Sequence, residues 1–379
     1  MITSPNPINM AAEIPFVIAI ILLLSSIQAK RKPPPRNWDK GPCLHLAKLG
    51  PHAACRTCTD KQHGFGADYK QMLQRALLQT SSTASATPKA PAWLRIAIGT
   101  IPRTTQQPYL ERVLNSIADE LPHNLNGHTI PPVGRIEVVV VNFRPKQHKV
   151  FDRVRKAFTA PSHPAREHFT FLELDPVRCD PPVPDNWAYK KGLSPEVSPR
   201  QQTRDVVSLY KTVGQITTGQ PTTPTTVPTA TQPTCQHALI VEDDFELCPG
   251  GLHLIKHAIN KASKGGWSGL RVGVAGNGIV IPCHDLEPIT NYLLEHQYMM
   301  PVDLLLPEWF IRIHKSAKGY LHASEIFRIN DKNLFNHIGI VSSFDDGRGI
   351  RRTSMCGDTL KTNTWMKQES FDTKCKCTS

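Results

Sequence analysis

Two kinds of apolar pattern alternate along the chain from residue 93 to residue 244. Short apolar runs with few polar interruptions predict strands that are buried on both faces. The expected strands are 94–103, 135–145, 168–176 and 237–244. Longer segments repeat apolar residues every three or four positions, as an amphipathic helix does. The expected helices are 109–121, 150–158 and 200–216. Strands that alternate with helices in this way predict an α/β domain with a mainly parallel sheet.

The last of these strands ends in three acidic residues, Glu242, Asp243 and Asp244. Burial of an unpaired carboxylate is costly, so we expect the three side chains to meet water, basic groups or a metal ion. Side chains alternate along a strand, which places Glu242 and Asp244 on one face and Asp243 on the other. Ligands of parallel α/β sheets bind beyond the carboxyl ends of the strands. A solvated acidic turn that ends the strand is the alternative.

Two carboxylates at such a strand end suit a hard divalent cation, Mn²⁺ or Mg²⁺, whose remaining ligands are phosphate oxygens. The cation would neutralise charge on a departing diphosphate. The chain contains neither the GxxxxGK[ST] pattern of a P-loop nor a GxGxxG pattern. These absences argue against a P-loop and against a Rossmann dinucleotide site.

The chain has 379 residues and a net charge of +12, but its basic residues are scattered. The densest basic stretch runs from Arg144 to Lys156. A scattered distribution favours a solvated basic face, or a face that receives phosphates, over a surface for duplex nucleic acid. We therefore expect no nucleic-acid partner.

The apolar run at residues 14–29 predicts a signal-anchor or a cleaved signal peptide, preceded by a short cytoplasmic tail at 1–13. No Lys or Arg precedes the run and three follow it, which by the positive-inside rule favours a cytoplasmic C-terminus. The ten cysteines favour an oxidising lumen instead. We expect entry into the secretory pathway, with contact to the membrane through this segment.

The remaining chain divides by composition. Residues 30–92 are expected to form a Pro/Ser/Thr-rich stem with a short helix around Tyr69–Leu78, and residues 93–355 the main folded domain, which would carry any catalytic activity. Within it, Thr and Pro fill thirteen of the eighteen positions of an insertion at 217–234, which predicts a solvated or O-glycosylated loop. Residues 356–379 are a cysteine-containing tail. Cys235 is expected to pair with Cys248.

Five blocks in order resemble the N-acetylglucosaminyltransferase IV family, glycosyltransferase family 54, over the catalytic region at residues 94–345. The blocks are "IAIGTIPRTTQQPYLERVLNSI" (96–117), "QQTRDV" (201–206), "LIVEDD" (239–244), "GIVIPCHDLEPITNYLLEHQYMMPVDLLL" (278–306) and "LFNHIGIVSSF" (334–344). The resemblance implies a GT-A-like α/β fold and a single-pass type II protein of the Golgi membrane. It also implies metal-dependent transfer of N-acetylglucosamine from UDP-GlcNAc, with inversion, to a mannose of a glycoprotein N-glycan.

Residue by residue, the resemblance places the acidic metal motif on Glu242, Asp243 and Asp244 and a further metal or diphosphate contact on His337. Asp303 matches the position of an aspartate that we interpret as the general base. A helix N-cap at Asp303 and a core histidine at His337 are the alternatives.

The other candidate contacts divide between donor and acceptor. Donor contacts are expected at Thr100, Pro102, Arg103, Gln202 and Asp205. Acceptor contacts are expected at Gly278, in a tight turn, and at Trp309, for which a place in the core is the alternative.

Three other activities remain open at this stage. A related transferase could act on another glycan, such as the glycan of a GPI anchor. A secreted protein without catalytic activity could bind sugars or cations through the acidic residues. A hydrolase with paired carboxylates would release free sugar without needing an acceptor.

Overall fold

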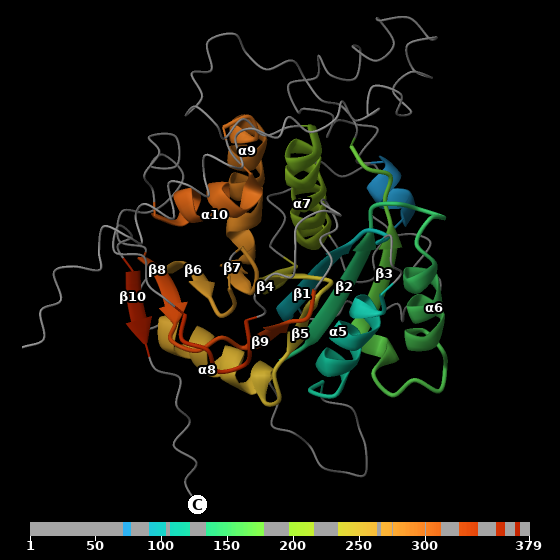
Figure 1. Ribbon diagram of the computed structural model, residues 1–379, viewed down its shortest axis with the longest axis horizontal. Helices are drawn as coiled ribbons and strands as arrows, with labels where there is room; N and C mark the ends of the chain where they lie inside the picture. The colour runs from blue at the N-terminus through green and yellow to red at the C-terminus, as the bar shows by residue number, and fades with distance from the viewer. Residues whose placement is uncertain are drawn as a thin grey trace, which may run out of the picture. The chain divides into compact units, whose positions relative to one another are not determined.

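The computed structural model describes twelve segments of the chain, and every structural statement below refers to them (Figure 1). The segments are 71–76, 91–103, 107–121, 134–177, 197–215, 234–263, 267–274, 276–299, 301–311, 326–339, 354–360 and 368–371. The predicted cytoplasmic tail, the apolar run at 14–29 and residues 217–233 of the insertion lie outside them, as do most of the stem and much of the C-terminal tail. No helix within these segments has both the length and the apolar composition needed to cross a membrane.

The described chain forms one eight-stranded sheet in the order β10-β8-β6-β7-β4-β1-β2-β3. Its strands are β1 (Ala92–Thr100), β2 (Ile136–Asn142), β3 (Phe169–Glu173), β4 (Cys235–Glu242), β6 (Trp267–Arg271), β7 (Ile279–Pro282), β8 (Ile326–Asn330) and β10 (Gln368–Phe371). β7 is antiparallel to both of its neighbours, and the other pairs are parallel. Two short strands, β5 (Phe245–Leu247) and β9 (Phe335–His337), form a separate antiparallel pair.

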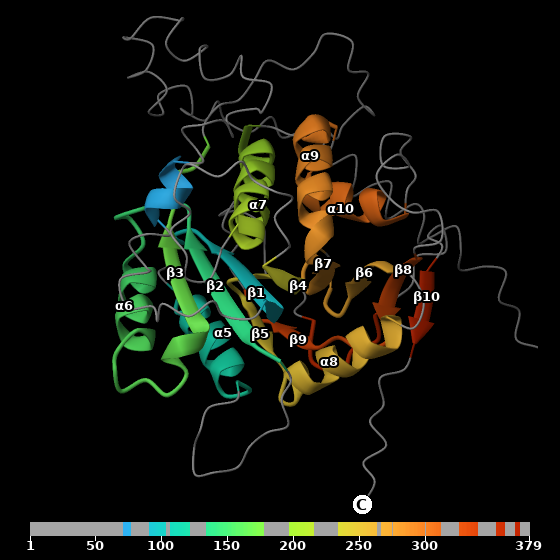
Figure 2. The same cartoon turned by 180° about the vertical axis from the view of Figure 1, so that it is seen from behind.

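Helices cover both faces of the sheet, as Figure 1 shows and Figure 2 repeats from behind. One face carries α5 (Tyr109–Ala118), α6 (Lys149–Phe158) and α8 (Gly251–Ala262), and the other carries α7 (Val197–Gln215), α9 (Leu286–His296) and α10 (Val302–Ile311). Two short 3-10 helices, η3 (Arg166–His168) and η4 (Cys283–Asp285), precede β3 and α9. The predicted α/β class, a mainly parallel sheet flanked by helices, is confirmed.

Successive side chains of each central strand point to opposite faces of the sheet and pack into two hydrophobic cores, one on each face. In β4, Leu239 and Val241 join the core under α5, α6 and α8, whereas Ala238 and Ile240 join the core under α7, α9 and α10. A strand that buries both faces reads as a continuous apolar run, which is why the sequence pattern located these strands. All four predicted strands and three predicted helices are present, and residues 71–76 of the predicted stem helix are helical.

The order of strands in the sheet changes direction at β1, which makes the end of β1 a topological switch point. β2 and then β3 add to one side of β1, while β4 adds to the other side, and both neighbours are parallel to β1. In register, Gly99 lies opposite Glu242 of β4, so these two strands end side by side. A crevice at such a switch point is where α/β sheets bind ligands.

Two disulfides join the described segments, Cys235–Cys283 and Cys248–Cys356. The predicted Cys235–Cys248 pair is wrong. Cys235 is the first residue of β4. Cys248 follows β5, which comes after the last residue of β4. An eight-residue strand spans roughly 25 Å, several times the Cα separation that a disulfide allows.

Candidate functional site

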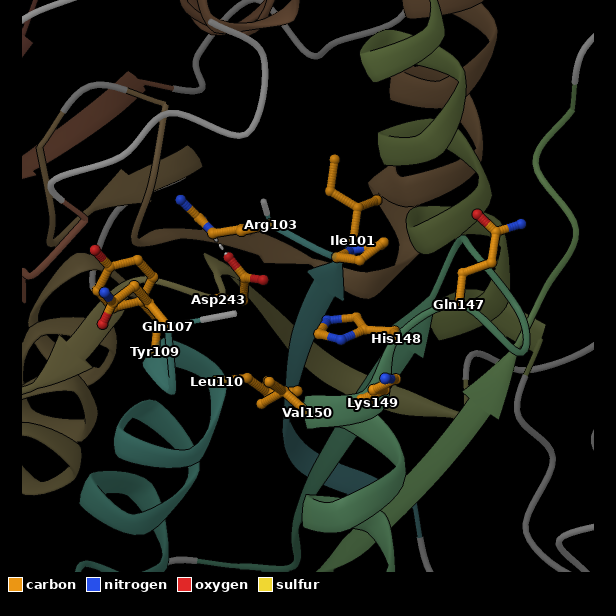
Figure 3. Close-up of a pocket in the computed structure, with 11 residues that line it drawn as sticks. Ile101, Arg103, Gln107, Tyr109, Leu110, Gln147, His148, Lys149, Val150 and Asp243 are labelled. Atoms are coloured by element: carbon orange, nitrogen blue, oxygen red, sulfur yellow. Dashed lines mark hydrogen bonds and ion pairs between the residues drawn. The ribbon is translucent and has the colours of Figure 1, made fainter. Parts of the chain in front are cut away.

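The loops after β1 and β4 bring four predicted site residues into contact. The Thr100 hydroxyl donates to Oδ2 of Asp243 at 2.5 Å, and Nη2 of Arg103 donates to Oδ1 of Asp243 at 2.5 Å. The same Arg103 nitrogen lies 3.1 Å from Oδ2 of Asp244. Figure 3 shows Arg103 and Asp243 facing each other above the end of β1. One guanidinium therefore bridges two consecutive carboxylates.

The predicted alternation of the acidic residues is wrong beyond Glu242. β4 ends at Glu242, and Asp243 and Asp244 form a turn before β5. Both aspartates are buried, with exposures of 6% and 5%, and both reach the same nitrogen of Arg103. Asp243 therefore does not point away from Asp244, because strand geometry no longer controls the turn.

His148 holds Asp243 in place through Thr100, although sequence reasoning missed it. His148 is the N-cap residue of α6, and its Nδ1 accepts a hydrogen bond from the backbone N–H of Phe151 at 3.3 Å. Nε2 must then carry the proton, and it lies 2.8 Å from the Thr100 hydroxyl oxygen. Thr100 in turn donates to Asp243. Burial, with a smaller effect of the Arg103 charge, lowers the pKa of His148 to about 4, so the ring is neutral at pH 7.

Acid should destabilise the protein through His148. The unfolded chain takes up a proton near pH 6.5, whereas the folded ring excludes it down to about pH 4, so stability is lost as the pH falls through this window. The loss amounts to at most about 3 kcal/mol. His148→Asn keeps a residue that can begin α6 but removes the titrating ring.

Urea unfolding of both proteins between pH 4 and pH 7.5 measures this contribution. The raised pKa values of Glu242 and Asp205 act in the opposite direction, but they are common to both proteins and cancel in the difference. We expect the unfolding free energy of the wild type minus that of His148→Asn to decrease as the pH falls from about 6.5 to about 4. Parallel curves over the whole range would show that His148 has the same pKa in the folded and unfolded protein, which would contradict the lowered pKa.

The Asp244 carboxylate lies between the guanidinium of Arg103 and the ring of His337. His337, which ends β9, has Nε2 3.5 Å from Oδ2 of Asp244, and its ring stacks on Phe245 with centroids 4.6 Å apart. Burial opposes ionisation, but the hydrogen bond from His337 and the charge of Arg103 hold the pKa of Asp244 below its ordinary value. The Oδ1 atom of Asp244 is buried and has no hydrogen-bond partner among the described residues.

Gly339 is required where it stands because its backbone passes next to Asp244. A Cβ atom at this position would lie 2.0 Å from Oδ2 of Asp244 and 3.0 Å from Nε2 of His337. Any larger residue would push these two side chains apart. The glycine in the "NHIG" block thus serves the contact between His337 and Asp244.

Glu242 ends β4, directly before the two aspartates. Its side chain is exposed to solvent, yet the surrounding protein raises its pKa to about 7, first by desolvation and second by repulsion from Asp244. The backbone N–H of Glu242 donates to Oδ1 of Asn277 at 2.9 Å, which connects the acidic turn to the loop before β7.

One oxygen of the acidic turn, Oδ1 of Asp244, is without a hydrogen-bond partner among the described residues and could bind a cation. Among the described residues no three His, Cys, Asp or Glu side chains are already arranged around a common metal position. Both oxygens of Asp243 already accept hydrogen bonds, from Thr100 and Arg103. Asp244 has a buried oxygen without a partner, and repulsion between Asp244 and Glu242 would be relieved by a cation. Asp244, with Glu242 beside it, is therefore the residue with an oxygen left for a metal, whereas each oxygen of Asp243 already accepts one hydrogen bond. A metal contact at Asp243 stays a prediction.

A pocket of about 270 Å³ adjoins the acidic turn. Its wall is formed by residues 101–103, 107, 109–110 and 147–150, together with Asp243 (Figure 3). Ile101, Pro102, Leu110 and Val150 provide apolar surface, while Lys149 and Arg103 provide positive charge. The predicted contacts Pro102 and Arg103 line this pocket, and Thr100 is buried beside it. Gln147, His148 and Lys149 are wall residues that no sequence motif identified.

The two predicted donor contacts on α7 do not line the pocket. Asp205 is buried, accepts a hydrogen bond from Nε2 of Gln201 at 2.8 Å, and lies 3.7 Å from Nη1 of Arg144, just beyond β2. Burial raises the pKa of Asp205 to about 6. Its neighbour Gln202 is half-buried. Asp205 therefore joins α7 to the loop after β2 rather than facing the pocket.

Asp303 is exposed in the first turn of α10 and is not the cap residue of that helix. A Cβ atom at Gly276 would lie 3.5 Å from Cβ of Asp303. The next residue, Asn277, accepts the backbone N–H of Glu242. Asp303 is thus separated from the acidic turn by a single loop, and its side chain is exposed to solvent.

The two predicted acceptor contacts, Trp309 and Gly278, lie in the core and in a turn, respectively. Trp309 is fully buried and packs against Tyr292 with ring centroids 5.2 Å apart, so the predicted sugar contact is wrong and the core alternative holds. Gly278 has a φ of 65°, and a Cβ there would lie 2.7 Å from the backbone nitrogen of Gly273. Its N–H donates to the carbonyl of Ile240 at 2.9 Å. Gly278 therefore forms the predicted tight turn, between β6 and β7.

Comparison with known proteins gave one kind of match. No protein-family model matches the chain, and no curated protein matches it. Among solved structures, the chain is similar to the crystal structure of S. aureus TarS residues 1–349, a glycosyltransferase, with a TM-score of 0.33 and 11% sequence identity. The match covers 62% of this chain and 56% of that one, so the chain spans just over half of its neighbour's length.

Proposed function

We propose that this protein is a glycosyltransferase that takes a sugar from a nucleotide-sugar donor. The observation that carries the proposal is the contact of Thr100 and Arg103 with Asp243 and Asp244 at the switch point of the sheet, beside a pocket. The resemblance to the N-acetylglucosaminyltransferase IV family extends the proposal to a specific reaction. In it, N-acetylglucosamine passes from UDP-GlcNAc, with inversion, to a mannose of an N-glycan.

The pocket is assigned to the nucleoside of the donor. At about 270 Å³ it is smaller than most sites for whole ligands, which occupy roughly 300–1,000 Å³, and it suits the nucleoside part of a larger molecule. Apolar wall residues would contact the base, and the buried Asp243 carboxylate can accept a hydrogen bond from a ribose hydroxyl. Arg103 and Lys149 supply the positive charge that phosphate groups require.

Asp244 and Glu242 are assigned to a divalent cation, Mn²⁺ or Mg²⁺. Such a cation, when bound, neutralises the charge that develops on the departing diphosphate. The contribution of this chain is to keep Asp244 ionised and oriented. His337 and Arg103 do so from one oxygen, which leaves the other oxygen for a ligand.

Asp303 is assigned to the acceptor side as general base. In a single displacement the acceptor hydroxyl must lose its proton as it attacks the anomeric carbon. An exposed carboxylate on a helix, next to the loop that contacts Glu242, is suitably open to a glycan. The proton would pass from the hydroxyl to the Asp303 carboxylate.

We propose the Golgi lumen as the compartment, with residues 14–29 as a membrane anchor or, alternatively, a signal peptide whose cleavage yields a secreted protein. Two disulfides within the catalytic region support an oxidising compartment. The partners would be the nucleotide sugar, a glycoprotein glycan and the membrane.

Photolabelling tests the placement of the donor. We expect UDP-GlcNAc with a photoreactive group on the uracil to label peptides that contain the pocket-wall residues 101–103, 107, 109–110 or 147–150. Excess UDP should prevent labelling and excess ADP should not. Labelling that is spread over the chain, or that UDP does not displace, would contradict the assignment.

A further inference from the structure

We infer that Arg103 couples the binding of the cation to the binding of the nucleotide, an inference that rests on the proposed function. The guanidinium is an internal cation at the acidic turn. Nη2 of Arg103 lies 2.5 Å from Oδ1 of Asp243 and 3.1 Å from Oδ2 of Asp244. The Arg103 side chain is only 8% exposed, and its guanidinium carbon lies 5.1 Å from the Tyr109 ring centroid.

A divalent cation that arrives alone meets this positive charge. The atom of Asp244 that fits a metal, Oδ1, belongs to the same carboxylate whose Oδ2 contacts Arg103. Two cations on one carboxylate repel each other, and burial reduces the screening by water and salt. We therefore expect the cation by itself to bind weakly to the protein with Arg103 in this position.

The diphosphate of the donor would remove the repulsion between the cation and Arg103. Arg103 also lines the pocket assigned to the nucleotide, so its guanidinium lies between the acidic turn and the donor site. A planar guanidinium pairs well with phosphate oxygens. When cation and diphosphate enter together, the diphosphate supplies the negative charge that both the cation and Arg103 need.

The two aspartates each retain a partner if Arg103 turns toward the phosphates. Asp243 keeps the hydrogen bond from Thr100, and Asp244 keeps the contact with His337. Departure of Arg103 therefore leaves neither buried carboxylate without a partner, which would be costly. The contacts made by Thr100 and His337 are what allow Arg103 to serve two sites.

Linkage makes the effect measurable from either side, because UDP must tighten Mn²⁺ binding by the same factor as Mn²⁺ tightens UDP binding. In the wild-type protein we expect UDP to strengthen Mn²⁺ binding by about tenfold or more. Arg103→Gln should bind Mn²⁺ alone about tenfold more tightly than wild type and should lose most of the coupling. Arg103→Lys retains the charge and should retain part of the coupling.

The experiment titrates Mn²⁺ into the full chain with and without UDP and follows free Mn²⁺ by its electron paramagnetic resonance signal. Arg112→Gln is the matched control, because Arg112 is an arginine that is 51% exposed and pairs with Glu246, two residues beyond Asp244. This control removes the same charge nearby without touching the aspartates. It should bind Mn²⁺ as wild type does, and thermal unfolding checks that each variant is folded.

The outcomes separate the inference from the proposed function. If wild type binds UDP and Mn²⁺ without mutual influence, or if Arg103→Gln and Arg112→Gln bind Mn²⁺ alone equally, the role of Arg103 is wrong. If wild type binds no UDP at any Mn²⁺ concentration, the proposed function itself is wrong. Should Arg103→Gln fail to fold, the coupling in wild type and its reduction in Arg103→Lys still decide the question.

Discussion

Asp244→Asn should reduce sugar transfer by about 10²–10³-fold or more, the usual effect of removing one group that stabilises developing charge. The amide keeps the volume of Asp244 but loses the charge that a cation requires. Because Asp244 is buried with a lowered pKa, we also expect a loss of stability above pH 4 of no more than about 3 kcal/mol. Arg103 would retain its contact with Asp243.

Glu246→Gln provides the matched control for this variant. Glu246 lies on β5 two residues beyond Asp244, pairs with Arg112, and has no assigned role in the site. Transfer of a radiolabelled sugar and Mn²⁺ binding should be unchanged in this control and nearly absent in Asp244→Asn. If both variants transfer sugar at the wild-type rate, the acidic residues are only a turn that ends β4.

Asp303→Asn should lower turnover by about 10²–10⁴-fold while leaving UDP binding intact, because an amide cannot accept the proton of the acceptor hydroxyl. The side chain is exposed in the first turn of α10, so the substitution should leave the fold unchanged. Turnover and UDP affinity are measured separately on the same preparation.

Glu308→Gln is the control within the same helix. Glu308 lies 3.5 Å from the Tyr292 hydroxyl and should tolerate the change with little effect on turnover. If Asp303→Asn loses UDP affinity together with turnover, Asp303 belongs to the donor site. If it keeps both, the general base lies elsewhere, with Asp345 and Asp346, outside the described residues, as the next candidates.

The pattern of apolar residues was sufficient for four strands of the sheet, β1 to β4, because its information is local. Leu239 and Val241 pack into one core and Ala238 and Ile240 into the other, so β4 had to appear in the sequence as a continuous apolar run. The position of the acidic turn followed from this strand, since ligands of such sheets bind beyond the strand ends.

Contacts between distant parts of the chain were not predictable in the same way. His148 meets Thr100 across 48 positions, and nothing in the local sequence distinguishes it from any other polar residue before a helix. Arg103 was identified as a donor contact, but its bridge between Asp243 and Asp244 spans 140 positions to Asp243 and depends on a turn that ends strand alternation. The disulfide partners of Cys235 and Cys248 depend on the fold in the same way.

The most direct test of the proposed activity is a transfer assay with the full chain, Mn²⁺, a mannose-terminated N-glycan and a panel of UDP-sugars. UDP release and the mass of the glycan are followed together, with and without acceptor. The account predicts UDP release from UDP-GlcNAc that depends on Mn²⁺ and on the acceptor, with the glycan gaining one N-acetylhexosamine. UDP-sugar consumption that yields free sugar without an acceptor, or no consumption of any UDP-sugar in the panel, would contradict it.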